Sequence, residues 1–267
     1  MWLAFLLTLI AGLATIAGGV LGVNKRVVQK IPISVVLAFA AGAMICVSVI
    51  DLIPEAMESL TGHFGINTAL AVSAAAMAIG AGIVYVIDGL LPRSNSIRCS
   101  NKDLTAQNQQ VVGRAKLFRS GVIIAAIMAA HNIPEGIVTF TGALHDMTLG
   151  VSLALAIALH NIPEGVSIAS PIYAATKNRF KAISYTIVAA LAEPIGALIA
   201  YLFVLRAIPE HLFGLIFAVT AGMMLYISIS ELMPSAQRNA ICKRHPKLGM
   251  TSGIATMAIS IFVINIL

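Results

Sequence analysis

Charged residues are scarce in this sequence. Asp, Glu, Lys and Arg together make up 10% of its 267 residues, whereas hydrophobic residues make up 59% and the mean hydropathy is +0.94. Soluble domains carry about 25% charged residues, so the composition excludes an ordinary soluble enzyme or soluble binding module. It predicts an all-α, polytopic membrane protein that is surrounded by the lipid bilayer.

Cysteine is also scarce, and one familiar zinc-enzyme motif is missing. The three cysteines, Cys46, Cys99 and Cys242, have no metal-binding spacing and are odd in number. Neither a thiolate metal site nor a disulfide framework is therefore indicated. The sequence has no His-Glu-x-x-His, the motif of zinc metalloproteases. We therefore expect no enzyme activity and no resident cofactor.

Long hydrophobic runs are abundant. Eight of them approach the ~20 residues that a transmembrane helix needs, and short loops join most of them. The runs cover residues 2–23, 32–58, 67–91, 120–142, 148–172, 182–205, 211–235 and 249–267. We predict a single transmembrane domain over residues 1–267, with eight helices in one bundle.

Lysine and arginine are concentrated in alternate loops. All 17 of them except Arg206 lie in the first, third, fifth and seventh loops, and the second and fourth loops have none. Cytoplasmic loops carry the excess of Lys and Arg, so we predict that both termini lie outside the cell. This explains the pI near 9.4 without a nucleic-acid partner. The longest loop, residues 92–119, is polar and is predicted to be a flexible cytoplasmic linker.

One hexapeptide occurs twice. His131-Asn132-Ile133-Pro134-Glu135-Gly136 recurs 29 residues later, from His160 to Gly165. Histidine and glutamate four residues apart lie on one face of a helix. The proline leaves the carbonyl four residues earlier free, and the glycine lets another backbone approach closely. A single histidine of this kind is usually structural, but the two copies together predict a metal site between neighbouring antiparallel helices.

Most of the eleven acidic residues lie inside predicted helices. A membrane-embedded carboxylate costs about 2.5 kcal/mol or more, so such residues usually mark an ion path. No basic residue lies inside these helices, and a bound cation is the simplest counter-charge. By helix orientation we predict an outer group of Asp51, Glu55 and Glu58, a central group of Glu135, Glu164 and Glu193, and an inner group of Asp88 and Glu231. The alternative for the outer and inner acids is a hydrogen bond at a helix end.

Two further residues fall at the depth of the repeated histidines. Glu193 precedes Pro194 in the sixth helix, where the proline again loosens the backbone. Met44 is central in the second helix, either as a metal neighbour or as an ordinary core residue.

The two hexapeptides resemble the ZIP family of divalent-metal transporters. Further matches are Asp51-Leu52-Ile53-Pro54-Glu55, Glu193-Pro194 and Glu231-Leu232-Met233-Pro234. The likeness extends over essentially the whole chain and is closest to the bacterial ZupT-type branch. It implies import of zinc, and with it iron, manganese or cobalt, across the bacterial inner membrane into the cytoplasm. Among protein partners, a second copy of the chain in a homodimer is the one that we consider.

The resemblance also implies a binuclear centre. One metal would use His131, Glu135, His160 and Glu164, with Met44 nearby. The second would use Asn132, Asn161 and Glu193, and would share Glu135 and Glu164 as bridges. Some family members have an acid at the position of Asn161, so the neutral amide here implies a weaker or less selective second site. The histidine-rich cytoplasmic loop of many eukaryotic relatives is absent.

The chemistry of these ligands fits divalent transition metals. Imidazole suits zinc and iron, whereas carboxylate and amide oxygens suit manganese and iron. Such a site would select against magnesium and calcium without ranking the first-row metals strongly. The residues alone leave two rival functions open. One is transport by a proton relay without metal, and the other is metal sensing, although the sequence shows no appended signalling domain.

Overall fold

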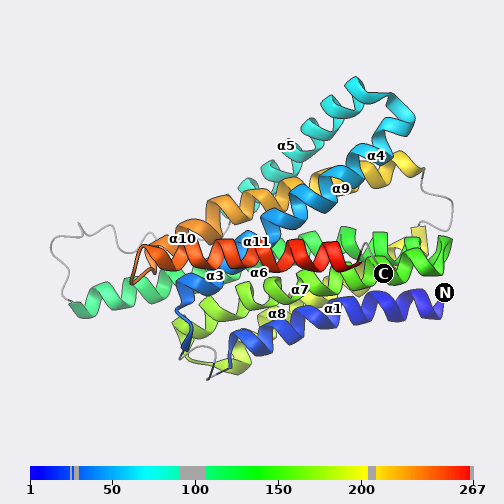
Figure 1. Cartoon of the computed structure of the whole chain (residues 1–267). Helices are drawn as coiled ribbons and strands as arrows, with labels where there is room; N and C mark the ends of the chain where they lie inside the picture. The colour runs from blue at the N-terminus through cyan, green and yellow to red at the C-terminus, as the bar shows by residue number, and fades with distance from the viewer. Residues whose placement is uncertain (25, 27–29, 91–105, 204–208, 265–267) are drawn as a thin grey trace.

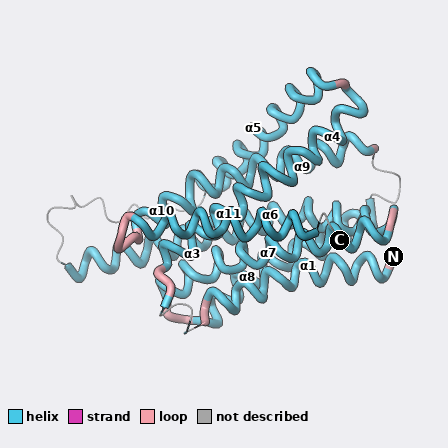
Figure 2. The backbone as a smooth tube through the Cα atoms, viewed as in Figure 1, coloured by secondary structure: helices cyan, strands magenta, loops and turns pink. Residues whose placement is uncertain are grey.

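In a computed structural model that describes residues 1–24, 26, 30–90, 106–203 and 209–264, the chain forms a bundle of helices (Figure 1). These residues contain no strand (Figure 2). The helices are α1 (Trp2–Gly22), α3 (Ile33–Val47), α4 (Ile53–Phe64), α5 (Ile66–Leu90), α6 (Ala106–His145), α7 (Met147–Thr176), α8 (Arg179–Phe203), α9 (Glu210–Ile227), α10 (Met233–Arg238) and α11 (Arg244–Ile264). Two short π-helical segments, η1 (Ser48–Leu52) and η3 (Ser228–Leu232), connect α3 to α4 and α9 to α10.

The all-α membrane fold is confirmed. Eight continuous helical stretches among the described residues are long and apolar enough to cross a membrane. Seven of them agree with the predicted runs to within several residues at each end. Large apolar side chains such as Trp2, Leu70 and Phe262 remain exposed on the flanks, where lipid covers them. The chain is therefore a multi-pass membrane protein.

The fourth stretch corrects the predicted loop at residues 92–119. Helix α6 begins at Ala106, so residues 106–119 are helical, whereas residues 92–105 lie outside the described part of the chain. Polarity was a poor guide here because Ala, Gln, Lys and Arg are all good helix formers. The helical extension also has packing partners, since Phe118 lies against the main hydrophobic cluster.

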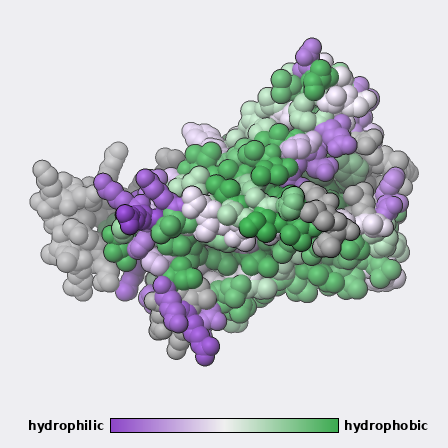
Figure 3. All heavy atoms as spheres, in the orientation of Figure 1, coloured by the Kyte–Doolittle hydropathy of each residue, from purple (hydrophilic) through white to green (hydrophobic). Residues whose placement is uncertain are grey.

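Both chain ends lie at one end of the bundle. The α4–α5 and α6–α7 turns lie at that end too, whereas the turns before α3, α8 and α11 lie at the other end (Figure 1). Figure 3 shows apolar side chains along the flank of the bundle and hydrophilic side chains mainly near its ends. This alternation of turns is the one that the distribution of basic residues requires.

Small residues let the helices around the hexapeptides pack backbone against backbone. A side chain on Gly136 in α6 would collide with the carbonyl of Glu193 in α8. A side chain on Gly165 in α7 would collide with the carbonyl of Thr15 in α1. The close approach predicted for both motif glycines is confirmed. It brings α8 against the first copy of the hexapeptide and α1 against the second.

The two π-helical segments have related sequences. Each begins with a serine that donates a hydrogen bond to the carbonyl of a methionine four residues earlier: Ser48 to Met44 at 2.8 Å and Ser228 to Met224 at 2.7 Å. Each ends two residues before a proline. The wider π turn accommodates a proline that has no N–H to donate. Asp51 and Glu231 therefore occupy equivalent turns.

The orientation of the bundle can be tested by cysteine labelling. We expect an impermeant maleimide to label Gly62→Cys and His145→Cys in intact cells, in a background in which Cys99 is replaced by serine. Both positions are exposed near the end that carries the termini. The exposed native Cys242 lies in the turn before α11, and should be labelled only after the cells are permeabilised. Labelling of Cys242 from outside would reverse the orientation.

The packing at Gly136 gives a stability prediction. Gly136→Ala should lower the free energy of unfolding by on the order of 1–3 kcal/mol, because α6 and α8 must separate to admit the methyl group. The matched control is Gly113→Ala on the same helix, where an added methyl group meets nothing within 4 Å. Thermal unfolding of the purified proteins in detergent compares the two. Equal loss of stability in both variants would contradict the α6–α8 contact.

Candidate metal centre

The two hexapeptides and Glu193 meet in the interior of the bundle. Helices α6 and α7 each carry one copy, and α8 carries Glu193. None of the predicted ligands in these three helices is more than 4% exposed, namely His131, Asn132, Glu135, His160, Asn161, Glu164 and Glu193. Burial of this many polar groups is costly unless each finds a partner.

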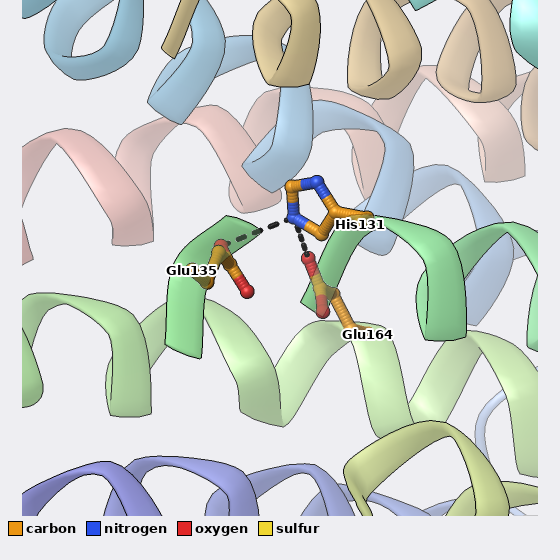
Figure 4. Close-up of side chains that lie close together, drawn as sticks. All are labelled: His131, Glu135 and Glu164. Atoms are coloured by element: carbon orange, nitrogen blue, oxygen red, sulfur yellow. Dashed lines mark ion pairs between the residues drawn. The ribbon is translucent and has the colours of Figure 1, made fainter. Parts of the chain in front are cut away.

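The first predicted set of ligands is brought together. One donor atom from each of His131, Glu135 and Glu164 lies within 4.8 Å of the other two. His131 Nε2 lies 3.1 Å from Glu135 Oε1 and 3.3 Å from Glu164 Oε1, so the imidazole lies between the two carboxylates (Figure 4). His160 Nε2 lies 2.7 Å from the same Glu135 oxygen. Zinc bonds to nitrogen and oxygen are about 2.0–2.2 Å long, so small side-chain rotations would admit an ion among these atoms.

The second predicted set lies beside the first. Asn161 Nδ2 donates hydrogen bonds to Glu193 Oε2 and to the carbonyl of Ala11, each at 2.9 Å. Asn132 Nδ2 donates to the carbonyl of Ala189 at 3.2 Å. These bonds use the amide nitrogens and leave the amide oxygens, the atoms that could bind a metal, without a hydrogen-bond partner among the described residues.

The centre therefore holds buried oxygen atoms that accept no hydrogen bond within the described part of the chain. They are Asn132 Oδ1, Glu135 Oε2, Asn161 Oδ1, Glu164 Oε1, Glu164 Oε2 and Glu193 Oε1. Buried polar atoms are almost always satisfied, so a cluster of exceptions calls for an explanation. No buried lysine or arginine is found among the described residues. The cluster consequently has the charge and the lone pairs to bind cations.

Sequence reasoning missed the contribution of α1 to this centre. Ala11 accepts a hydrogen bond from Asn161. A methyl group on Gly12 would lie 3.1 Å from Glu193 Oε2. The only signal in the sequence is that Ala11 and Gly12 are small, which permits close helix packing but does not indicate which helix packs there. Met44 is fully buried in the main hydrophobic cluster, and its place beside the metals stays a prediction.

A cavity adjoins the centre on the side that faces the end of the bundle with the termini. It has a volume of about 210 Å³, and its lining includes Asp51, Glu55, Glu135 and His160. Two of the predicted outer acids therefore share one space with two of the predicted central ligands. Glu58 is exposed on α4 and is not among the described residues that line this space.

The opposite end differs from the prediction. Asp88 is paired with Arg119, whose Nη2 lies 2.8 Å from Asp88 Oδ1. The expectation that no basic residue pairs with the acids is wrong for Asp88, because the helix that carries Arg119 begins earlier than predicted. Glu231 lies nearby and accepts a hydrogen bond of 3.5 Å from the Ser120 hydroxyl.

Comparison with known proteins agrees with this geometry. Residues 95–261 match the profile of the family described as ZIP zinc transporters. The zinc transporter ZupT of Chlorobaculum parvum is 38% identical over 261 residues, which cover 97% of each chain. The zinc transporter ZupT of Oceanobacillus iheyensis is 39% identical over 266 residues, which cover 99% of this chain and 98% of the relative.

A more distant relative aligns just as completely. The zinc transporter ZupT of Clostridium perfringens is 34% identical over 274 aligned positions, which cover 98% of this chain and 95% of the relative. The chain belongs to the ZIP zinc transporter family, in the branch of the bacterial ZupT proteins, and is a membrane transporter rather than an enzyme.

Proposed function

We propose that this chain, a single transmembrane domain over residues 1–267, imports Zn²⁺ across the bacterial inner membrane into the cytoplasm. The cluster of buried carboxylate and amide oxygens that accept no hydrogen bond within the described part of the chain carries the proposal. Its mixture of nitrogen and oxygen donors also suits Fe²⁺, Mn²⁺ and Co²⁺. Both termini face the outside in this scheme.

The first ion binds at His131, Glu135, His160 and Glu164. The contacts of His131 with both carboxylates and of His160 with Glu135 support this set. In the absence of metal, the imidazoles contact the same oxygens that the ion would use. Binding thus exchanges imidazole–carboxylate contacts for metal bonds, which limits the net gain and allows release.

The second ion binds at Glu193 and at the amide oxygens of Asn132 and Asn161, with Glu135 and Glu164 as bridges. Bridging carboxylates hold two cations close together because the negative charge screens their repulsion. The unpartnered oxygens of both asparagines and of Glu193 support this assignment. A site with one carboxylate of its own and two neutral amides should hold its ion more loosely than the first site.

The route begins in the cavity lined by Asp51 and Glu55, with the exposed Glu58 near its mouth. The ion passes from these carboxylates to Glu135 and His160, which line the same cavity. It leaves toward Glu231 and Asp88. The Arg119–Asp88 ion pair supports a closed inner end in this conformation, since the guanidinium occupies the carboxylate that a leaving ion would use.

The buried cluster and the cavity also argue against the two rival functions, a proton relay and a metal sensor. A proton relay has no need for two neutral amides whose buried oxygens accept no hydrogen bond from the described residues. A sensor without transport gives no reason for a cavity that joins acids near the surface to the buried ligands.

Uptake by single variants in proteoliposomes tests the shared bridges. Glu164→Ala should abolish zinc uptake, because this carboxylate serves both ions. Glu193→Ala should be less harmful, because it serves the second ion alone. Asp146→Ala removes an exposed carboxylate from the α6–α7 turn and should leave uptake near native. If Glu164→Ala transports zinc normally, the shared-bridge arrangement is wrong.

The second site is tested by Asn161→Asp. The aspartate cannot donate to Glu193 or Ala11, and it places two carboxylates side by side in a low-dielectric interior, where the repulsion is strong. The metal-free variant should therefore be less stable than the native protein, and zinc should stabilise it more. Zinc uptake should saturate at a lower concentration with a lower maximal rate, while magnesium stays excluded.

Equilibrium zinc binding, thermal unfolding with and without zinc, and uptake of zinc, iron and manganese measure these effects. Asn67→Asp is the control, because it adds the same charge at an exposed position on α5. If Asn161→Asp binds the same number of zinc ions with unchanged affinities, Asn161 is not a ligand.

A further inference from the structure

A second pair of imidazole rings lies outside the central site, at the end of the bundle that carries the termini. His63 lies in the last turn of α4, and His211 lies in the first turn of α9. The two rings stack with their centroids 4.1 Å apart and their planes 21° apart. Phe64 approaches the His211 ring edge-on, with centroids 5.9 Å apart. The stack thus joins two helices that are far apart in the sequence.

Helix packing fixes the positions of the two histidines. Helices α4 and α9 lie side by side (Figure 1). One turn below the rings, an added methyl group on Gly214 would lie 2.8 Å from Leu60 Cγ and 3.0 Å from the carbonyl of Ala56. The backbones are therefore in close contact just beneath the stack, and both rings project from regular helix rather than from a loop.

The ring nitrogens are available to a ligand. His63 is exposed and His211 is half-buried. Neither imidazole makes a hydrogen bond or ion pair with any residue in the part of the chain that the structure describes. Among the described residues, the two rings make ring contacts with each other and with Phe64, which leave their lone pairs to solvent or to an ion.

The two imidazoles can bind a first-row divalent metal once their rings rotate. Zinc bonds to imidazole nitrogen are about 2.0–2.1 Å long, and the metal lies in the plane of each ring that binds it. The rings, with centroids 4.1 Å apart and planes 21° apart, must therefore turn out of the stack so that one nitrogen of each faces the ion. The terminal torsion of histidine is broad and allows such a rotation at little cost. Water would fill the remaining coordination positions.

The location connects the pair to the cavity. Glu55 precedes His63 by eight residues on α4, which is about 12 Å along the helix axis. The Glu55 side chain lines the cavity that reaches Glu135 and His160. On α9, Ile216, Phe217 and Thr220 line the same cavity. The same two helices therefore carry the imidazoles at their outer ends and line the cavity further along.

We propose that His63 and His211 form a metal site at the outer mouth of the cavity, which captures Zn²⁺ or another first-row divalent ion together with water and delivers it to Glu55 and Asp51. The capture role rests on the proposed import function, whereas metal binding by the pair does not. Two protein ligands hold an ion weakly, which suits a site that must release it to the carboxylates below.

Binding is tested by histidine modification on the purified full-length protein. Diethyl pyrocarbonate reacts with free imidazole, and mass spectrometry reads each histidine separately, so the central site does not confound the result. Zn²⁺ should slow modification of His63 and His211 together. The exposed His145 in the last turn of α6 is the control and should react at the same rate with and without Zn²⁺.

Removing one histidine of the pair should end the protection of the other by Zn²⁺. In His211→Ala, Zn²⁺ should no longer protect His63. His63→Phe keeps an aromatic ring on the stack and should likewise end the protection of His211, which separates loss of a ligand from loss of packing. If Zn²⁺ protects neither histidine in the native protein, or still protects His63 in His211→Ala, the site does not exist.

Zinc uptake tests the capture role. His63→Phe and His211→Ala should each raise the Michaelis constant for zinc several-fold with little change in the maximal rate, and the double variant should be no worse than either single one. His145→Ala should match the native protein. Protection of both histidines with an unchanged Michaelis constant would overturn capture. Normal zinc uptake by Glu164→Ala would instead overturn the shared-bridge arrangement of the central site. It would leave the protection result unaffected.

Discussion

Three carboxylates buried in a membrane bundle, with no buried lysine or arginine among the described residues, set the constraint on the rest of the structure. Glu135 and Glu164 contact imidazoles, and Glu193 accepts a hydrogen bond from Asn161. These partners do not satisfy every lone pair. Such an arrangement persists only if the surrounding helices hold it together when no cation is present. The backbone contacts at Gly136 and Gly165 serve this purpose, because they fix α8 and α1 against the two hexapeptides.

The carboxylates at the two ends of the bundle have different surroundings. Asp51 and Glu55 line a cavity and leave their charges open to a cation. Asp88, at the other end, has its charge matched by Arg119. Asp51 and Glu231 nevertheless occupy equivalent π-helical turns before a proline. One of these two carboxylates faces a cavity, and the other lies beside an ion pair. This difference fits a conformation in which the centre is accessible from the side of Asp51 and closed on the side of Glu231.

The hexapeptides could be identified from the sequence because their ligands are close together along one helix, where a spacing of four residues fixes their common face. The eight helices followed from long apolar runs. The role of α1 could not be predicted, since Ala11 contributes a backbone carbonyl that no residue type distinguishes. The Asp88–Arg119 pair was missed because the polar residues before position 120 were predicted to be a loop rather than the start of α6. His63 and His211 have no informative spacing, and only the packing of α4 on α9 brings them together.

The amide of Asn161 links three helices, because this α7 side chain donates to Glu193 in α8 and to the carbonyl of Ala11 in α1. In the proposed second site, the same side chain would offer its oxygen to an ion without breaking those bonds. A carboxylate would attract the ion more strongly but would repel Glu193 once the ion had left. A transporter passes through an ion-bound and an ion-free state in each cycle. A residue that avoids repulsion with Glu193 in the ion-free state keeps the free energies of the two states closer together. In the proposed binuclear centre, weaker binding at the second site accompanies that balance.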